Sequence, residues 1–427
     1  MKFHRQIARR WWYGGATLVV ACAGAPRPTP APAPVPAPAP VPGPFAQSVV
    51  RPGIDVLLTD SMALVRGRRV GFVTNVNAVD RSGRSAITRL RESRVELVAL
   101  FGPEHGLEAT AAPGEKVASS VYRDTDIPIY SLYGQTRAPT TAMLQGIDVI
   151  LVDLPDVGAR YYTWLATTVE VMQAAGAHRI PVIVLDRPNP INGVVQGNVL
   201  DPAFASAVGR LAVPMRHGLT LGEHARLARA DLNLAVDLRV IPVAGWTRDM
   251  PFGATGLPFL APSPNLRDLD ALFHYPGTCL FEGTALSVGR GSDAPFHQVG
   301  APWLDTTAVL ARVRSASLPG VAFRGVQFTP VQSGDAKFDG TSLLGIRLDI
   351  TDRTRYDPVR TAIHLLAAVQ AVHPTQIRIG GSFDRLAGGT ALRTALVRGD
   401  APDVIVATWS DDLAAYRSRV APHLLYR

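Results

Sequence analysis

The sequence predicts an α/β protein built on a parallel β-sheet with helices on both of its faces. Short, almost uninterrupted apolar runs recur along the chain, and stretches with apolar residues at helical spacing lie between them. Strands that are apolar throughout are buried on both faces, which is typical of parallel sheets between helical layers. Hydrophobic residues make up 47% of the 427 residues, which is ample for a large core.

The first 22 residues have the composition of an export signal. A basic head is followed by a short apolar run, Ala16 to Ala21, which falls well below the roughly 20 residues of a membrane-spanning helix. The run ends in Val-Val-Ala-Cys, which resembles a bacterial lipobox, whose Cys takes a diacylglycerol before cleavage. We expect residues 1–22 to be a signal peptide with Cys22 as the lipidation site. The alternative is an ordinary cleaved signal with an incidental Cys.

Residues 23–45 are dominated by Pro and Ala, a composition that favours extended polyproline structure and acts as a semi-rigid spacer. Together with the lipobox, this linker predicts an exported lipoprotein, anchored to a membrane on its periplasmic or cell-surface side. If Cys22 is lipidated, Cys279 has no partner and no disulfide is expected.

The net charge of +8 does not indicate a nucleic-acid partner. The basic residues are nearly all Arg and are scattered, without a dense basic stripe and interleaved aromatics. No pattern of His, Cys and Asp residues has metal-ligand spacing, and no Gly-rich loop has the strand-turn-helix frame of a dinucleotide site. We therefore expect no metal and no cofactor.

Three segments are expected beyond the linker. Residues 46–255 should form the parallel sheet domain, residues 256–303 a Gly- and Pro-rich connection that lines a cleft, and residues 304–427 a smaller α/β domain. Expected strands are 70–74, 95–101, 127–132, 147–154, 181–186, 321–329 and 342–350. Expected helices are 161–175, 219–230, 358–371 and 410–419.

Polar side chains directly follow three of the expected strands, in segments 102–106, 155–163 and 186–190. Ligands of open parallel sheets bind outside the carboxyl ends of the strands, so these segments should converge on one rim. Glu104, in a tight Gly-bounded loop beside His105, suits a general acid, although it could equally cap a following helix. Adjacent residues usually point apart, so His105 is more readily a substrate hydrogen-bonder.

The other candidates each have a structural alternative. Asp156 and Arg160 could hold a ligand at a helix start or pair with each other. Tyr161 and Tyr162 could stack on a sugar or lie in the core. Further candidates with such alternatives are Asn189, which could instead bond the main chain of a rigid turn, His217, which precedes a Thr220–Glu223 capping box, and Glu282 and Arg290, which could form a buried ion pair.

Taken together, the ordered segments resemble the exo-β-N-acetylmuramidase family, formerly known as a domain of unknown function. The resemblance runs from Gly53 to Tyr426 and rests on segments 101–106, 153–164, 186–190, 216–223, 263–265, 281–291 and 424–426. It implies a Rossmann-like domain followed by a smaller C-terminal α/β domain. It also implies release of terminal N-acetylmuramic acid from the non-reducing ends of peptidoglycan fragments, a reaction of cell-wall recycling.

Positions that match the family pattern imply catalytic roles for Glu104, His105 and Glu282. They imply substrate contacts for Asp156, Arg160, Tyr162, Asn189, His217 and Arg290. The chain departs from the pattern at Pro155, where a polar residue is expected, and at Ala285, where Asn is common. Both departures concern substrate preference rather than reaction class.

Two other functions are compatible with the residues. A non-catalytic lipoprotein that only binds wall sugars predicts Glu104 buried against an Arg, without an open cleft. A hydrolase of esters or amides, using Asp156 and a His, needs a nucleophilic Ser or Cys at a strand end, and none stands there.

Overall fold

The computed structural model describes residues 49–123 and 125–427, which belong to one compact unit. The predicted signal peptide (1–22), Cys22 and the linker (23–45) lie outside the described residues. Within that part of the chain, no helix is long and apolar enough to cross a membrane. Since a single unit holds all described residues, the domain boundaries at 255 and 303 stay predictions.

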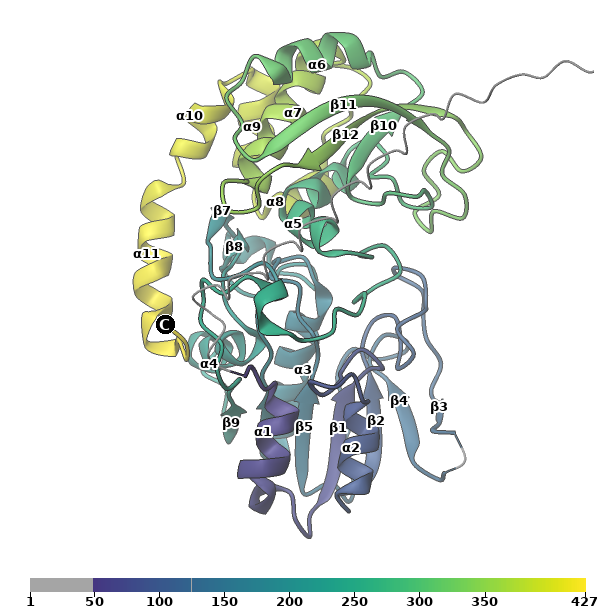
Figure 1. Cartoon of the computed structure of the whole chain (residues 1–427), viewed down its shortest axis with the longest axis vertical. Helices are drawn as coiled ribbons and strands as arrows, with labels where there is room; N and C mark the ends of the chain where they lie inside the picture. Colours follow the sequence, from purple (N-terminus) through teal and green to yellow (C-terminus); the bar gives the residue numbers. More distant parts are fainter. Residues whose placement is uncertain (1–48, 124) are drawn as a thin grey trace, which may run out of the picture. The chain divides into compact units, whose positions relative to one another are not determined.

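A seven-stranded sheet dominates the N-terminal half of the described chain, in the order β3-β4-β2-β1-β5-β6-β9 (Figure 1). All neighbours are parallel except the edge strand β3, which runs antiparallel to β4. The strands are β1 (Arg69–Thr74), β2 (Glu96–Gly102), β3 (Ser120–Val121), β4 (Pro128–Ser131), β5 (Val149–Asp153), β6 (Val182–Leu185) and β9 (Leu238–Ile241). The strand order reverses between β1 and β5, which is where open α/β sheets bind their ligands.

Helices cover both faces of this sheet, as the apolar strands predict. On β5, Val149 and Leu151 pack into one hydrophobic cluster with α1 and α2, whereas Ile150 and Val152 pack into another with α3 and α4. These helices are α1 (Gly53–Asp60), α2 (Ala86–Glu92), α3 (Thr163–Ala177) and α4 (Leu221–Asp231). The predicted α/β class and the five predicted strands of this sheet are confirmed, while α1, α2, β3 and β9 were not predicted.

A smaller antiparallel sheet, in the order β10-β12-β11, forms the C-terminal half together with further helices. The elements are α5 (Leu269–Thr278), β10 (Gln298–Ala301), α6 (Thr306–Arg314), β11 (Val321–Phe328), β12 (Leu343–Ile350), α7 (Pro358–Val372), α8 (Gly381–Ala387), α9 (Ala391–Arg398), α10 (Pro402–Ala407) and α11 (Ser410–Val420). The predicted strands 321–329 and 342–350 and helices 358–371 and 410–419 are confirmed. The stretch 256–303 is not purely irregular, because it contains α5 and β10.

Short elements complete the fold. They are the antiparallel pair β7 (Gln196–Val199) and β8 (Pro214–Arg216) and the 3₁₀ turns η1 (Met62–Leu64), η2 (Pro202–Phe204), η3 (Phe252–Thr255), η4 (Cys279–Gly283) and η5 (Ala421–His423). After α11 the chain ends beside α4 (Figure 1). There the hydroxyl of Tyr426 donates to Asp186 at 2.6 Å, and its ring packs on Trp246.

Candidate active site

A cavity of about 360 Å³, here called the central cavity, lies beyond the carboxyl end of β2. Six segments build it: the loop after β2, the segment after β4, the start of α3, the segment between η2 and β8, the stretch from residue 263 to 296, and the loop between β11 and β12. Its volume is that of a site for a small molecule. The lining includes Glu104, His105, Tyr133, Tyr161, Tyr162, Thr163, Tyr275, Glu282, Arg290, Phe296, Asp335 and Lys337.

Glu104 is fixed in the wall of this cavity by hydrogen bonds. Its Oε1 accepts from the Gly114 amide at 2.9 Å, and its Oε2 accepts from the Thr163 hydroxyl at 2.6 Å. Thr163 is the first residue of α3, so the helix start and the loop after β2 hold the carboxyl together. Residues 104–109 form turns, and the alternative in which Glu104 caps a following helix is therefore wrong.

His105 faces the same cavity as Glu104, although neighbouring side chains usually diverge. The reason is its left-handed backbone, with φ of +70°, which breaks the alternation of an extended chain. Its Nδ1 lies 2.7 Å from the carbonyl oxygen of Ala111 and must donate to it, so Nε2 of the neutral ring is the acceptor. His105 thus joins Glu104 in the cavity wall, with its Nδ1 held by the backbone.

Tyr133 is an additional residue beside Glu104 that the sequence did not single out. Burial and the Glu104 carboxylate raise the pKa of its phenol, while the neighbouring Arg137 lowers it. The Arg137 guanidinium lies 4.8 Å from the centre of the Tyr133 ring. Tyr133 lies two residues after the end of β4, a strand that neighbours β2. Its position after an expected strand is the sequence feature that could have identified it.

Glu282 and Arg290 form the ion pair that the sequence left as an alternative, with Nε donating to Oε1 at 2.5 Å. Both side chains nevertheless line the central cavity. Burial lowers the pKa of Arg290, but the adjacent Glu282 carboxylate outweighs it and the pKa is raised. Only Nε of Arg290 takes part in this bond, so the two terminal nitrogens remain as donors for an anionic group.

Lys337 and Asp335 enter the cavity wall from the loop between β11 and β12. The Lys337 ammonium donates to the carbonyl oxygens of Glu282, Thr284 and Leu286 at 2.8–3.1 Å, and burial lowers its pKa. Lys337 therefore fixes the turn that carries Glu282. The sequence feature that could have identified Lys337 as a site residue is the scarcity of Lys in this Arg-rich chain.

Tyr162 lines the central cavity, and its hydroxyl donates to the Pro262 carbonyl at 2.8 Å. Its ring meets Trp164 edge-on, with centroids 4.7 Å apart. Tyr161 lines the cavity too and donates to the Pro276 carbonyl. Both tyrosine rings are buried in the hydrophobic core and also line the central cavity. The two alternatives, packing in the core and lining a ligand site, therefore do not exclude each other.

Asp156 and His217 lie away from the central cavity. The Asp156 carboxylate accepts from the Gly158 amide at 3.0 Å and lies 3.5 Å from Nε2 of His217. His217 is fully buried, and its Nδ1 accepts from the Leu219 amide. The expectation that these two residues contact the same ligand as Glu104 is not met.

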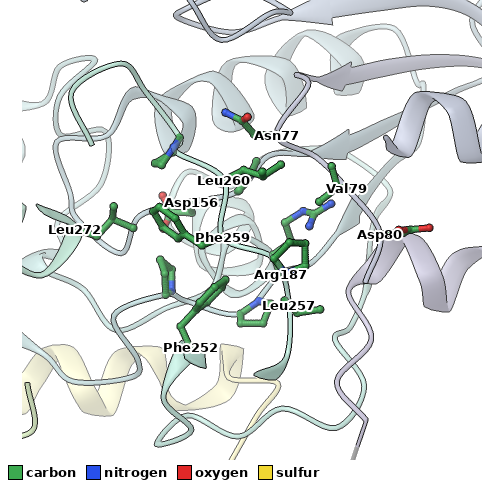
Figure 2. A pocket seen from close by; sticks show the side chains of 15 residues that line it. Asn77, Val79, Asp80, Asp156, Arg187, Phe252, Leu257, Phe259, Leu260 and Leu272 are labelled. Atoms are coloured by element: carbon green, nitrogen blue, oxygen red, sulfur yellow. The ribbon is translucent and has the colours of Figure 1, made fainter. Parts of the chain in front are cut away.

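Asp156 borders a different pocket of only about 50 Å³, shown in Figure 2. Its wall is mostly apolar, with Phe252, Leu257 and Phe259 around the polar groups. Arg187 points into it but is bound to Asp153 through two hydrogen bonds. One water needs about 10–15 Å³, so this pocket holds a few waters and not a sugar.

Arg160 and Asn189 hold backbone instead of a ligand. Arg160 is 1% exposed, and its guanidinium donates to four carbonyl oxygens, those of residues 198, 213, 386 and 387. It does not pair with Asp156. The Asn189 side chain donates to the Leu219 carbonyl and accepts from the Ile191 amide, as expected for the rigid-turn alternative. The predicted substrate contacts of both residues are therefore corrected.

Comparisons of the chain with known proteins agree on one family. The family model described as exo-β-N-acetylmuramidase NamZ matches with its N-terminal part over residues 70–270 and with its C-terminal part over residues 273–426. A Bacillus subtilis (strain 168) protein named peptidoglycan β-N-acetylmuramidase NamZ is 39% identical over 381 residues, which is 88% of this chain and 91% of the relative.

Two solved structures of DUF1343 family proteins from Bacteroides fragilis are also similar. One has a TM-score of 0.80 at 30% identity and the other a TM-score of 0.73 at 27% identity. Each comparison covers 89% of this chain and 99% of the solved chain. The resemblance seen in the sequence is thereby confirmed, and the chain belongs to the exo-β-N-acetylmuramidase NamZ family.

Proposed function

We propose that this protein is an exo-acting glycoside hydrolase that releases terminal N-acetylmuramic acid from the non-reducing ends of peptidoglycan fragments. Family membership over most of the chain supports the reaction class. The observation that carries the site is Glu104, a carboxyl held by two donors in the wall of a cavity of about 360 Å³. In the described part of the chain Glu104 pairs with no basic side chain, which disfavours the purely sugar-binding alternative.

Glu104 is the proposed general acid. It gives its proton to the glycosidic oxygen as the bond from that oxygen to the anomeric carbon breaks, through an oxocarbenium-like transition state. A water then adds to the anomeric carbon and loses a proton. Glu282 and Nε2 of His105 face the same cavity and are the groups able to take it.

Arg290 is the proposed contact for the lactyl carboxylate, the group that distinguishes muramic acid from glucosamine. Its terminal nitrogens are free of partners within the described residues, and a guanidinium can bind a carboxylate with two parallel hydrogen bonds. The side chain is held over the Phe296 ring at 4.9 Å, so it is oriented before the substrate arrives.

An esterase or amidase using Cys279 finds no support. Burial, with the Glu282 carboxylate adding to it, raises the pKa of this thiol well above its usual range. The nucleophile of cysteine enzymes is the thiolate, so a buried Cys held neutral is a poor candidate.

The test is incubation with a disaccharide that carries non-reducing N-acetylmuramic acid, with analysis of the released sugars. Glu104→Gln should lower kcat/KM by about 10²–10⁴-fold. Glu108→Gln is the matched control, because Glu108 belongs to the same loop but is exposed and does not line the cavity. Full activity of Glu104→Gln would remove Glu104 from the reaction.

Two further measurements complete the assignment. Glu282→Gln and His105→Gln tell apart the two acceptors of the water proton, since only the true acceptor shows a loss comparable to that of Glu104→Gln. The anomeric configuration of the N-acetylmuramic acid when it is first released shows whether the reaction retains or inverts. Retention requires two catalytic carboxyl groups about 5 Å apart, and inversion requires them roughly 6.5–9.5 Å apart.

We also propose that the protein is exported and lipidated at Cys22, with the linker as a spacer. The sequence around the Cys and the chemistry of the substrate, which lies outside the cytoplasm, support this. Metabolic labelling with a fatty acid should mark the wild-type protein and not Cys22→Ser. Labelling of both would show that another site carries the lipid.

A further inference from the structure

A second cavity, here called the side cavity, adjoins the central cavity and has a volume of about 260 Å³. Tyr133 and Thr163 line both cavities and form the wall between them. The remaining lining comes from α3, from the segment 205–210, and from Leu132 and Arg137 in the segment that follows β4. Two cavities with a shared wall provide room for a ligand on either side of it.

The general acid lies at that shared wall. Thr163 donates to the carboxyl of Glu104 at 2.6 Å, and Tyr133 lies close enough for the carboxylate to raise its pKa, after the larger effect of burial. A glycosidase must place its acid at the oxygen that joins two sugars, so one sugar lies on each side of the acid. Glu104 itself lines the central cavity, and Thr163, which holds its carboxyl, lines both cavities.

The charges indicate which sugar each cavity receives. The central cavity holds Arg290 with its free terminal donors, which suits the carboxylate of muramic acid. The side cavity has a mixed wall of polar and apolar side chains. Arg210 donates to Glu170 at 2.9 Å, Arg137 lies over the Tyr133 ring, and Thr167 and Ser206 add hydroxyl groups. Such donors and acceptors suit the hydroxyl and acetamido groups of an uncharged sugar.

We propose that the side cavity is the leaving-group subsite, which binds the uncharged hexosamine on the reducing side of the scissile bond. This inference rests on the proposed function. The lining side chains Thr167, Glu170 and Arg210 would contact that sugar, and Arg137 would flank it beside Tyr133. Binding energy from the leaving sugar would then orient the glycosidic oxygen toward Glu104.

The experiment compares two substrates that differ only in the leaving group: the disaccharide, and N-acetylmuramyl fluoride, whose leaving group is one atom. Ala205→Trp places a large side chain in the side cavity, whose wall includes Ala205. The ratio of kcat/KM for the disaccharide to kcat/KM for the fluoride should fall at least tenfold. Ala203→Trp is the matched control, exposed in the same segment but outside the lining, and should leave the ratio unchanged.

Arg210→Ala is a second variant that does not depend on accommodating a Trp, because Arg210 is part-exposed and bonds only other surface side chains. It should lower the same ratio severalfold without changing the melting temperature by more than a few degrees. An unchanged ratio in both variants would overturn the subsite and leave the hydrolase intact. Wild-type protein that cleaves neither substrate would overturn the proposed function and the subsite together.

Discussion

Asp186 is a buried carboxyl whose ionisation should limit the stability of the fold above pH 6. It follows β6 directly, is fully buried, and accepts hydrogen bonds from Thr220, Gly222 and Tyr426 at 2.6–2.8 Å. Burial raises the pKa of Asp186 to about 6, although these three donors act to lower it. The unfolded chain has the ordinary value of about 3.9.

The sign of the effect follows from proton binding. Between pH 4 and pH 6 the folded state keeps a proton on Asp186 that the unfolded state has released. The free energy of unfolding therefore falls as the pH rises, by up to about 1.4 kcal/mol per pH unit. With pKa values about two units apart, the loss is roughly 3 kcal/mol and is complete slightly above pH 6.

Urea unfolding of the wild type and of Asp186→Asn from pH 3.5 to pH 7.5 isolates this contribution. Asn has the same shape, can accept from Gly222, and does not ionise. The difference in unfolding free energy, wild type minus variant, should fall by roughly 3 kcal/mol across this range. Every other titrating group is common to both proteins and cancels.

Two results would refute the reasoning. A difference that stays constant within 1 kcal/mol would show that the three donors balance burial. A difference that rises with pH would show that the three hydrogen bonds lower the pKa of Asp186 by more than burial raises it. Asp186 would then stabilise the fold as a carboxylate.

Three further substitutions separate activity from stability. Thr163→Val removes the hydrogen bond that holds Glu104 in place and should lower kcat/KM roughly 10- to 100-fold at unchanged melting temperature, with Thr163→Ser as the control that retains activity. Equal loss in both variants would contradict this role. Arg160→Met removes a donor from four carbonyl oxygens, of which those of Val213 and Ala387 keep another donor. It should lower the unfolding free energy in urea by about 2 kcal/mol or more, whereas a loss below 1 kcal/mol would show that water replaces the guanidinium. Gly158→Ala should cost about 2 kcal/mol or more by the same measurement, because its φ is +77° and a Cβ would lie 2.5 Å from Asn189 Oδ1; an unchanged midpoint would mean that the turn can shift.

The strands of the parallel sheet were predictable because each is apolar along its whole length. β5, Val149–Asp153, is buried at every position, and the expected strand differs from it only at the ends. Helix α5 was missed, since Leu269–Thr278 contains Pro276 and Gly277, two residues that disfavour a helix interior. The glycine is needed there because the helix approaches α7 so closely that a Cβ at Gly277 would overlap the Pro358 carbonyl.

The candidate site was predictable in position but not in composition. The rule that ligands bind at the carboxyl ends of strands led to the correct loops, and Glu104, His105 and Tyr162 do line the central cavity. The same rule selected Asn189, whose side chain turns into the protein, and the buried His217 was selected for its place before a capping box. A strand end fixes where a loop begins, whereas the direction of each side chain depends on backbone angles such as the positive φ of His105.

Arg160 and Arg290 show what decides whether a buried Arg binds the backbone or is available to a ligand. Both are largely buried Arg residues next to an aromatic ring and near an acidic residue in the sequence. A buried carbonyl oxygen that lacks a hydrogen-bond donor costs about 1–3 kcal/mol. Loops with several buried carbonyl oxygens therefore bind the guanidinium group of an Arg. Arg160 meets four of them and has its terminal nitrogens fully used, whereas Arg290 meets one carboxylate through Nε and keeps its terminal nitrogens for a ligand. The number of backbone acceptors around a buried Arg, which only the fold determines, thus separates an Arg that holds the structure from one available to substrate.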